Sequence, residues 1–306
     1  MTDDDGAALL REGGPVVVVG PASWNTLVRL DALPDARSQT LFAAGHHDGL
    51  GGTSAGKALT LAALGVDVRL RTVLGADREA QLVREALAHP RIALDALDAA
   101  GGRTERHVNL MARDGGRVSV YLELPTPVAA PPVALDGARA AVVDLAGHAV
   151  PVLAAARATG VPVWCDVHDD DGVAEFQRPF ADAADVLLVS DAGLTDPAGY
   201  LRARVAGGAR LAVCTRGARG ALALDADGFW EVPATPVADV VDTDGAGDAF
   251  LSGLLAADLA GLPTAEALAW ASAAGALAVG TEALGAPHAT RASLRTLAAR
   301  VRVTRA

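Results

Sequence analysis

Apolar residues occur along the chain in short runs that alternate with segments of helical spacing. Such runs, bounded by glycine or charged residues, predict strands at 15–20, 66–73, 139–145, 161–166, 186–189 and 210–215. The intervening segments predict helices at 54–64, 77–88, 150–159, 173–184 and 197–206. Because strands and helices alternate, we expect a parallel sheet covered by helices on both faces.

Two segments depart from this alternation. Residues 103–112 and 117–122 alternate polar and apolar side chains and are joined by a glycine-containing turn, which predicts a hairpin outside the main sheet. Short strands between Leu27 and Ala44 could join it. Open α/β sheets bind ligands at the carboxyl ends of their strands. We therefore expect a lid over those ends, built from about 24–45 and 103–123.

The composition fits one large domain with this small lid over residues 1–306. Hydrophobic residues make up 51% of the chain but aromatic ones only 4%, so the core must consist mainly of Ala, Val and Leu. Residues 1–14 are acidic and lack the basic and apolar regions of a signal peptide, so we expect a flexible tail on a cytoplasmic protein. Charged residues interrupt the apolar stretches, so no membrane span is predicted.

Net charge indicates the kind of partner, and cysteine content indicates the state of the thiols. The net charge of -11 with scattered arginines disfavours nucleic acid, so a small-molecule ligand is expected. Cys165 and Cys214 each lie in an apolar, strand-like run, and two cysteines in a chain of this length indicate buried, reduced thiols rather than a disulfide framework.

The segment DTDGAGDAF, residues 242–250, carries the most specific chemistry. The apolar, β-branched residues 237–241 predict a strand before it and an apolar helix follows, so residues 245–247 should form a strand-to-helix turn. The first N–H groups of a helix lack partners and attract anions, and glycines leave room for a phosphoryl oxygen to reach them. Asp248 is placed to take a proton from an attacking hydroxyl. This pattern predicts phosphoryl transfer; alternatively, Asp248 only complements the helix dipole.

A second glycine-rich loop, GGTSAGKA at residues 51–58, matches the first seven positions of a P-loop. A P-loop NTPase is therefore a rival hypothesis. Ala58 stands where that motif needs a magnesium-binding hydroxyl, and no buried strand precedes the loop, which count against it. Lys57, the one lysine of the chain, either contacts the substrate or is a solvated helix residue.

Taken in this order, the two motifs resemble those of the ribokinase, or PfkB, family of carbohydrate and nucleoside kinases, and the likeness extends over nearly the whole chain. The resemblance implies an α/β three-layer sandwich with a mainly parallel central sheet and a small β-strand lid. It implies ATP-dependent phosphorylation of a hydroxyl on a small, sugar-like substrate, with Mg²⁺ and, in some relatives, K⁺. A nucleoside kinase, with Trp24 and Phe42 as stacking candidates, and an inactive sugar or nucleotide sensor are alternatives. Some relatives pair two subunits through the lid, so a homodimer is possible.

The resemblance also assigns roles by position. Asp248 corresponds to the catalytic base, and the amides of Gly245, Ala246 and Gly247 to the anion hole. Asp242 and Asp244 fall where relatives hold a monovalent cation. The positions matching the substrate site are Asn25, Gly51, Gly52, Gly56, Lys57, Asp166 and Asp248. The positions matching the nucleotide site are Ser190, Thr215, Gly217, Gly220 and Ser272.

Several positions depart from the family pattern. Asn25 stands where the sugar kinases carry an aspartate, and Gly56 stands where they carry an asparagine. The Asn-x-x-Glu magnesium motif expected near 186–194 is missing, so either Asp191 or Asp196 organises the water around Mg²⁺, or the phosphates hold the ion.

Histidines and neighbouring acidic residues offer further candidates. His168 follows Asp166 at a predicted strand end, and both could contact the acceptor. A metal cluster with His46 and His47 is the alternative, although loop solvation explains the acidic run 169–171 more simply. His107 and Asn109 share the polar face of a lid strand and either close over the substrate or face water.

Overall fold

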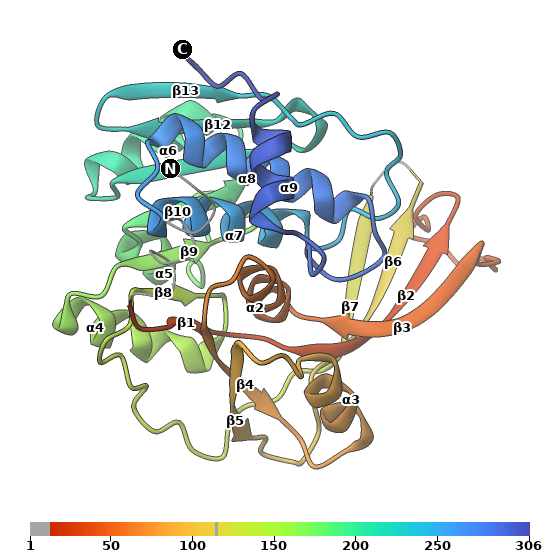
Figure 1. Ribbon diagram of the computed structural model, residues 1–306. Coiled ribbons are helices and arrows are strands. Elements are labelled where there is room, and N and C mark those ends of the chain that lie inside the picture. Colours follow the sequence, from red (N-terminus) through yellow and green to blue (C-terminus); the bar gives the residue numbers. More distant parts are fainter. Residues whose placement is uncertain (1–12, 114–115) are drawn as a thin grey trace.

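The computed structural model describes residues 13–113 and 116–306 (Figure 1). Within them the main sheet has ten strands in the spatial order β14-β13-β12-β11-β10-β9-β8-β1-β4-β5. All pairs from β11 to β5 are parallel, whereas β11 to β14 pair antiparallel. The strands are β1 (Val16–Val19), β4 (Val68–Leu74), β5 (Ile92–Asp98), β8 (Ala140–Val143), β9 (Val163–Asp166), β10 (Val186–Ser190), β11 (Leu211–Thr215), β12 (Ala221–Asp225), β13 (Gly228–Val232) and β14 (Thr304–Arg305).

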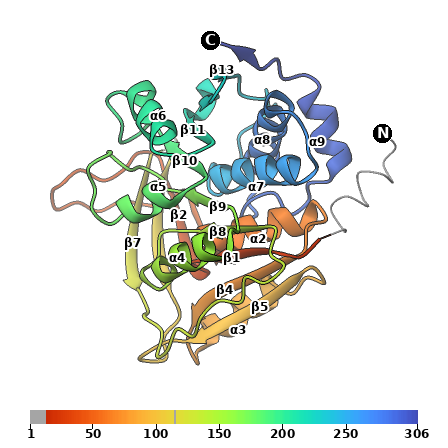
Figure 2. The same ribbon diagram turned by 90° about the vertical axis from the view of Figure 1, so that its left-hand side faces the viewer.

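Helices cover both faces of this sheet, as Figures 1 and 2 show. One layer contains α4 (Val150–Thr159), α5 (Arg178–Ala183) and α6 (Pro197–Ala206). The other contains α2 (Thr53–Ala63), α7 (Ala246–Leu259), α8 (Thr264–Val279) and α9 (Arg291–Ala298). A further helix, α3 (Arg78–Ala86), follows β4 and contacts the lid. The arrangement is the predicted three-layer α/β sandwich.

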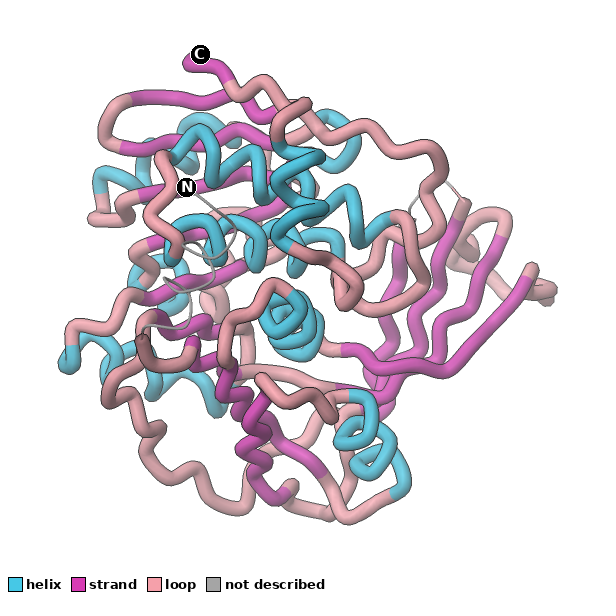
Figure 3. The backbone as a smooth tube through the Cα atoms, in the orientation of Figure 1, coloured by secondary structure: helices cyan, strands magenta, loops and turns pink. Residues whose placement is uncertain are grey.

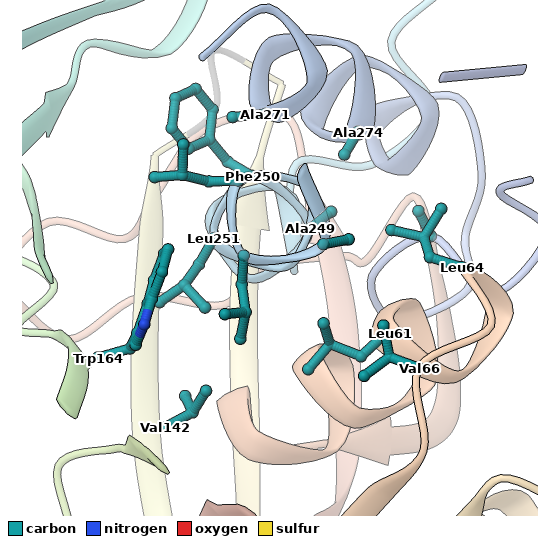
Figure 4. Close-up of a cluster of buried hydrophobic side chains, with 14 of the residues drawn as sticks. Leu61, Leu64, Val66, Val142, Trp164, Ala249, Phe250, Leu251, Ala271 and Ala274 are labelled. Atoms are coloured by element: carbon teal, nitrogen blue, oxygen red, sulfur yellow. The ribbon is translucent and has the colours of Figure 1, made fainter. Parts of the chain in front are cut away.

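The alternation of side chains along each strand divides the core in two. Val142 and Trp164 face α7, where they meet Leu251, while Leu61 of α2 lies close by (Figure 4). The cluster on the opposite face includes Cys165 and is closed by α4, α5 and α6. Helix α7 is apolar around most of its circumference because α2, α8 and the sheet surround it. This packing fixes the position of α7 against the sheet.

The lid is a separate four-stranded sheet in the order β3-β2-β6-β7, seen at the right of Figure 3. Its strands are β2 (Ser23–Leu30), β3 (Gly45–Gly51), β6 (Arg106–Ala112) and β7 (Arg117–Glu123). The face that carries Asn25, Arg29 and His107 is turned to the main body, because Arg29 there contacts Asp242. Val118 and Val120, on the opposite face of β7, are exposed.

Some of the predicted elements were wrong. Residues 237–241 form no strand, because no other strand of the described ranges lies beside them to pair with; Val240 is 62% exposed. The helix expected at 173–184 is shortened to α5. Of the lid strands expected between Leu27 and Ala44, only the end of β2 falls in that range; β3 begins just beyond it, and 31–44 form the connecting loop. Strands β5, β12, β13 and β14 were missed, and the last three make one edge of the main sheet antiparallel.

The remaining global expectations concern cysteines, membrane spans and the tail. Cys165 and Cys214 are buried and free, as predicted. Among the helices of the described ranges, none combines the length and apolar character needed to cross a bilayer. Most of the predicted tail, residues 1–12, lies outside the described residues.

Candidate active site

The carboxyl ends of the parallel strands bring polar residues to one edge of the sheet. Asp144 follows β8, and Asp166, Ser190 and Thr215 are the last residues of β9, β10 and β11. Neighbouring parallel strands end at the same edge, so these side chains lie in a row. This edge is where a ligand is expected in an open α/β sheet.

The first turn of α7 provides unpaired N–H donors. Gly245 is the N-cap with φ +72°, and a Cβ there would lie 2.5 Å from the Gly285 nitrogen, so only glycine fits. Among residues 13–113 and 116–306, the amides of Gly245, Gly247 and Asp248 donate no hydrogen bond, while that of Ala246 reaches Thr243 O at 3.4 Å. These free donors at the positive end of a helix can bind an anion.

The carboxylate of Asp248 is held on one side and free on the other. Its Oδ1 lies 2.7 Å from Lys57 Nζ and accepts a hydrogen bond from Thr53 Oγ1. Its Oδ2 has no hydrogen-bond partner in the described part of the chain, and a Cβ on Gly56 would lie 3.0 Å from it. Since the side chain is still slightly exposed, Oδ2 is the oxygen that can receive a proton.

Lys57 is completely buried, so the alternative of a solvated helix residue is wrong. Its ammonium lies 2.8 Å from Asp144 Oδ1 and 3.8 Å from Asp166 Oδ2, in addition to the contact with Asp248. Burial lowers the pKa of Lys57, but the charges of the three carboxylates raise this pKa by more, to above its ordinary value. The side chain therefore carries a positive charge.

The two other carboxylates differ in their surroundings. Asp144 is fully buried and accepts a hydrogen bond from Ser54 Oγ at 2.6 Å. Burial raises the pKa of Asp144 above its ordinary value, although Lys57 opposes the shift. Burial would also raise the pKa of Asp166, but His168 and Lys57 outweigh it and hold this pKa below its ordinary value. One ammonium facing three carboxylates leaves this pocket with an excess of negative charge.

The lid contributes polar side chains on its inner face. Asn25 Oδ1 accepts a hydrogen bond from the His107 amide at 3.0 Å, and Asn25 Nδ2 lies only 1.9 Å from where a Cβ on Gly51 would stand. The His107 ring contacts Tyr121 with centroids 3.8 Å apart. Asn109, on the same strand, is buried. Gly52, with φ +92°, leads directly into α2 and so connects this lid face to Lys57.

The aromatic candidates and the adjacent histidines differ in their surroundings. Trp24 packs against the hydrophobic core, and Phe42 is 90% exposed in the loop 31–44. His46 and His47 lie on β3, and no group of three potential metal-ligating side chains occurs in the described ranges. The structure therefore gives the metal-cluster alternative no support.

The residues matched to a nucleotide site form a second group. Ser190 and Thr215 are register partners on β10 and β11. The turn 217–219 ends at Gly220, which packs against the backbone after β13. Ser272 Oγ, on α8, donates to Pro233 O at 2.8 Å in that same segment. Ser190 and Thr215 thus lie side by side, and Gly220 and Ser272 both contact the segment that follows β13.

The carboxylates considered for Mg²⁺ are engaged by protein groups. Asp191 is paired with Arg219, and Asp196 caps α6 by accepting a hydrogen bond from Gly199 N at 2.9 Å. Mg²⁺ commonly keeps several waters and takes its remaining ligands from phosphates. The residues here therefore fit a metal carried by the nucleotide better than one held in a protein cage.

The two carboxylates matched to a cation loop face arginines of the lid. Arg29 contacts Asp242 at 3.4 Å and Glu282 at 2.8 Å, and Arg117 contacts Asp244 at 3.0 Å. Burial raises the pKa of Asp244, with Arg117 opposing the shift. Guanidinium groups thus supply positive charge beside this loop and connect it to the lid.

Sequence reasoning missed several residues of the site. In the sequence, Asp144 stands out only as a charge that interrupts an apolar stretch, and Thr53 and Ser54 only as members of a glycine-rich loop. The available signal was an acidic residue directly after the buried strand AAVV, the same pattern that singled out Asp166. Tyr121 had no comparable signal, because its role depends on which lid face turns inward.

Comparison with known proteins identifies the class of protein. The model of the pfkB family of carbohydrate kinases matches residues 16–291, and the chain belongs to this family. It is therefore a phosphotransferase with a hydroxyl acceptor, and ATP is the phosphoryl donor used in the family.

Individual relatives cover nearly the whole chain. An acarbose 7(IV)-phosphotransferase from Actinoplanes sp. is 34% identical over 93% of this chain and 98% of its own length. An ATP-dependent ribose-1-phosphate kinase from Halopiger xanaduensis is 30% identical over 90% of this chain and 95% of its own. Among solved structures, the microbiome-derived acarbose kinase Mak1 superposes with a TM-score of 0.80 and 29% identity, covering 94% of this chain and 99% of that one.

Proposed function

We propose that this protein transfers the terminal phosphoryl group of ATP to a hydroxyl of an uncharged or cationic carbohydrate, with Asp248 as the general base. The observation that carries the proposal is the first turn of α7, where free amides and a carboxylate with one unpaired oxygen lie within three residues of each other. Phosphoryl transfer depends mainly on positioning and on stabilising charge, and this turn offers both.

In the proposed reaction, the acceptor hydroxyl donates its proton to Asp248 Oδ2 as its oxygen attacks the terminal phosphorus in line, while the bond from that phosphorus to the bridging oxygen breaks and ADP leaves. The amides of Gly245 and Gly247 hold the charge that develops on the phosphoryl oxygens. Ser190, Thr215, Gly217, Gly220 and Ser272 would hold the nucleotide. Bound Mg²⁺ would neutralise phosphate charge. The lid face that bears Asn25 and His107 would contact the acceptor and exclude water.

The charge of the pocket favours the sugar class over phosphorylated acceptors. Asp144, Asp166 and Asp248 outnumber the single ammonium of Lys57, so an anionic acceptor would meet like charge. A neutral or amine-bearing carbohydrate avoids this repulsion. Similarity to two acarbose-phosphorylating proteins supports that choice, whereas the ribose-1-phosphate kinase represents the competing class.

A panel of acceptors tests the proposal by measuring acceptor-dependent release of ADP. The panel contains acarbose, maltotriose, ribose, ribose 1-phosphate and inosine, each with Mg-ATP. We expect the highest kcat/KM with a neutral or amine-bearing sugar. Preference for ribose 1-phosphate or inosine would overturn the acceptor class, and binding that changes only the melting temperature would indicate a sensor rather than an enzyme.

Two Asp→Asn variants of the same helix test the base. Asp248→Asn should lower kcat by about 10²- to 10⁴-fold, the usual contribution of a general base, while Lys57 keeps its contact with Asp144 and the fold persists. Asp258→Asn is the matched control, because Asp258 lies at the far end of α7 and pairs with Arg210 at 2.8 Å. Near-normal turnover in the first variant would refute the assignment.

A further inference from the structure

The single lysine of the chain lies inside the protein, between a strand end and the first turn of α7. Lys57 Nζ is 2.8 Å from Asp144 Oδ1 and 2.7 Å from Asp248 Oδ1. Neither Lys57 nor Asp144 exposes any side-chain surface. Asp144 is held in turn by Ser54 Oγ at 2.6 Å. The ammonium thus joins β8 to the proposed catalytic helix through two carboxylates.

Stability alone does not account for this arrangement. Removing charges from water is costly, and a buried ion pair is often no more stabilising than apolar residues of similar volume. The surrounding core is otherwise built from Ala, Val and Leu, so apolar residues in place of both Lys57 and Asp144 would suit it. We therefore look for the function of this charged group in its contact with Asp248.

The two carboxylate oxygens of Asp248 differ in their contacts. Lys57 Nζ and Thr53 Oγ1 both lie against Oδ1, and both come from the first turns of α2. Oδ2 makes no hydrogen bond within the described ranges, so its lone pairs are available. With Oδ1 fixed by a charged group that is itself fixed by Asp144, rotation of the carboxylate is restricted.

We propose that Lys57, anchored by Asp144, is a positioning residue that fixes the ionised carboxylate of Asp248 with Oδ2 directed to the acceptor hydroxyl. The inference rests on the proposed function, since it assigns a role to the neighbour of the proposed base. The charged groups that face Lys57 are Asp144 directly after β8, Asp166 from β9 and Asp248 from α7, and His168 lies 3.8 Å from Asp166.

Opposite shifts of the pH–rate profile provide the first test. Lys57→Met removes the positive charge, so carboxylates in the pocket protonate more readily, and the acid limb of kcat should move up by about one pH unit or more. We also expect kcat at its optimum to fall by about 100-fold, as for a misplaced catalytic group, with little change in KM for ATP. Asp144→Asn removes a negative charge instead, so the acid limb should move to lower pH.

Ser252→Ala is the matched control for a merely structural role. Ser252 is buried on α7, and its hydroxyl donates to Asp248 O at 2.7 Å and to Lys57 O at 3.3 Å. The variant loses buried hydrogen bonds to the same two residues but no charge. It should lower the melting temperature and leave the acid limb in place. Acid limbs that coincide in all three variants and the unaltered protein would overturn the inference.

A spectroscopic measurement remains informative if Lys57→Met fails to fold. In untagged protein labelled with ¹⁵N-lysine, the side-chain ammonium gives a single signal. A buried, ion-paired ammonium exchanges its protons slowly, so we expect that signal at neutral pH and its persistence above pH 10.4, the ordinary lysine value. It should shift in Asp248→Asn. A signal that titrates like a free lysine, or one indifferent to Asp248→Asn, would contradict the proposed contact.

The two proposals fail in different ways. If the unaltered protein phosphorylates no acceptor in the panel, the proposed function fails, while the lysine signal still tests the contact between Lys57 and Asp248. If the unaltered protein is active and Lys57→Met keeps its kcat and acid limb, the positioning role is wrong and the proposed function stands.

Discussion

The space beside Gly247 allows a prediction that separates folding from catalysis. A Cβ at this position would meet only Asp166 Oδ2, at 3.9 Å, so Gly247→Ala should not clash with the protein. Alanine is favoured over glycine in helices by about 0.5–1 kcal/mol, so Gly247→Ala should be at least as stable as the unaltered protein. The added methyl group would stand where a phosphoryl oxygen approaches the helix amides.

The expected effect on turnover is much larger than the effect on stability. Loss of one donor to a transition-state oxyanion lowers kcat by about 10²- to 10³-fold, which corresponds to about 2.7–4 kcal/mol. We expect a loss in this range for Gly247→Ala and a greater one for Gly247→Val. The assay is acceptor-dependent ADP release, together with a thermal melt of each variant.

Gly275→Ala is the matched control. Gly275 is also a helical glycine, on α8, and a Cβ there would make ordinary contacts, 3.5 Å from Ala246 O and 3.9 Å from Phe250 Cβ. This variant should keep normal turnover and melt at the same or a slightly higher temperature. If Gly247→Val melted normally and kept full activity, the assignment of the anion hole to this turn would be refuted.

Three further predictions concern a helix cap, an ion pair between the lid and residue 244, and the outer surface of the lid. Asp77 caps α3 and accepts a hydrogen bond from Thr104, and these hydrogen bonds outweigh burial and lower the pKa of Asp77. Asp77→Ala should therefore lower the free energy of unfolding by about 1 kcal/mol at neutral pH. In denaturation measurements this difference should vanish as the pH falls through the lowered pKa. Arg117→Gln breaks a half-exposed ion pair with Asp244 and should lower kcat/KM by at most about fivefold. The loss of kcat/KM should be smaller at high salt, which screens the pair, and a loss that does not depend on salt would contradict the prediction. Val120 is 46% exposed on the outer lid face and belongs to an apolar surface suited to pairing two lids. We expect the unaltered protein to sediment as a dimer and Val120→Asp to sediment as a monomer. An unaltered protein that sediments as a monomer would exclude that dimer.

The sequence by itself determined the fold class and the centre of the site. Strand and helix periodicity depend on local side-chain patterns, so α4 and α6 could be placed closely from the sequence, and their alternation with β8 to β11 required a largely parallel sheet. The glycines and Asp248 at the start of α7 also carry a local signal, because a helix terminus makes its unpaired amides from its own backbone. Their proposed roles stay predictions until turnover is measured.

Contacts between distant parts of the chain were decided by the tertiary structure alone. Lys57 and Asp248 are 191 residues apart, and no local pattern shows that a lysine is buried against a carboxylate on another helix. The same holds for Asp144 beside Lys57 and for the lid arginines beside Asp242 and Asp244. Residues 237–241 show the reverse, since a strand-like sequence forms no strand where no neighbouring strand is available to pair with it. Local periodicity reports which elements form, whereas charge pairing and strand pairing depend on which elements the fold brings together.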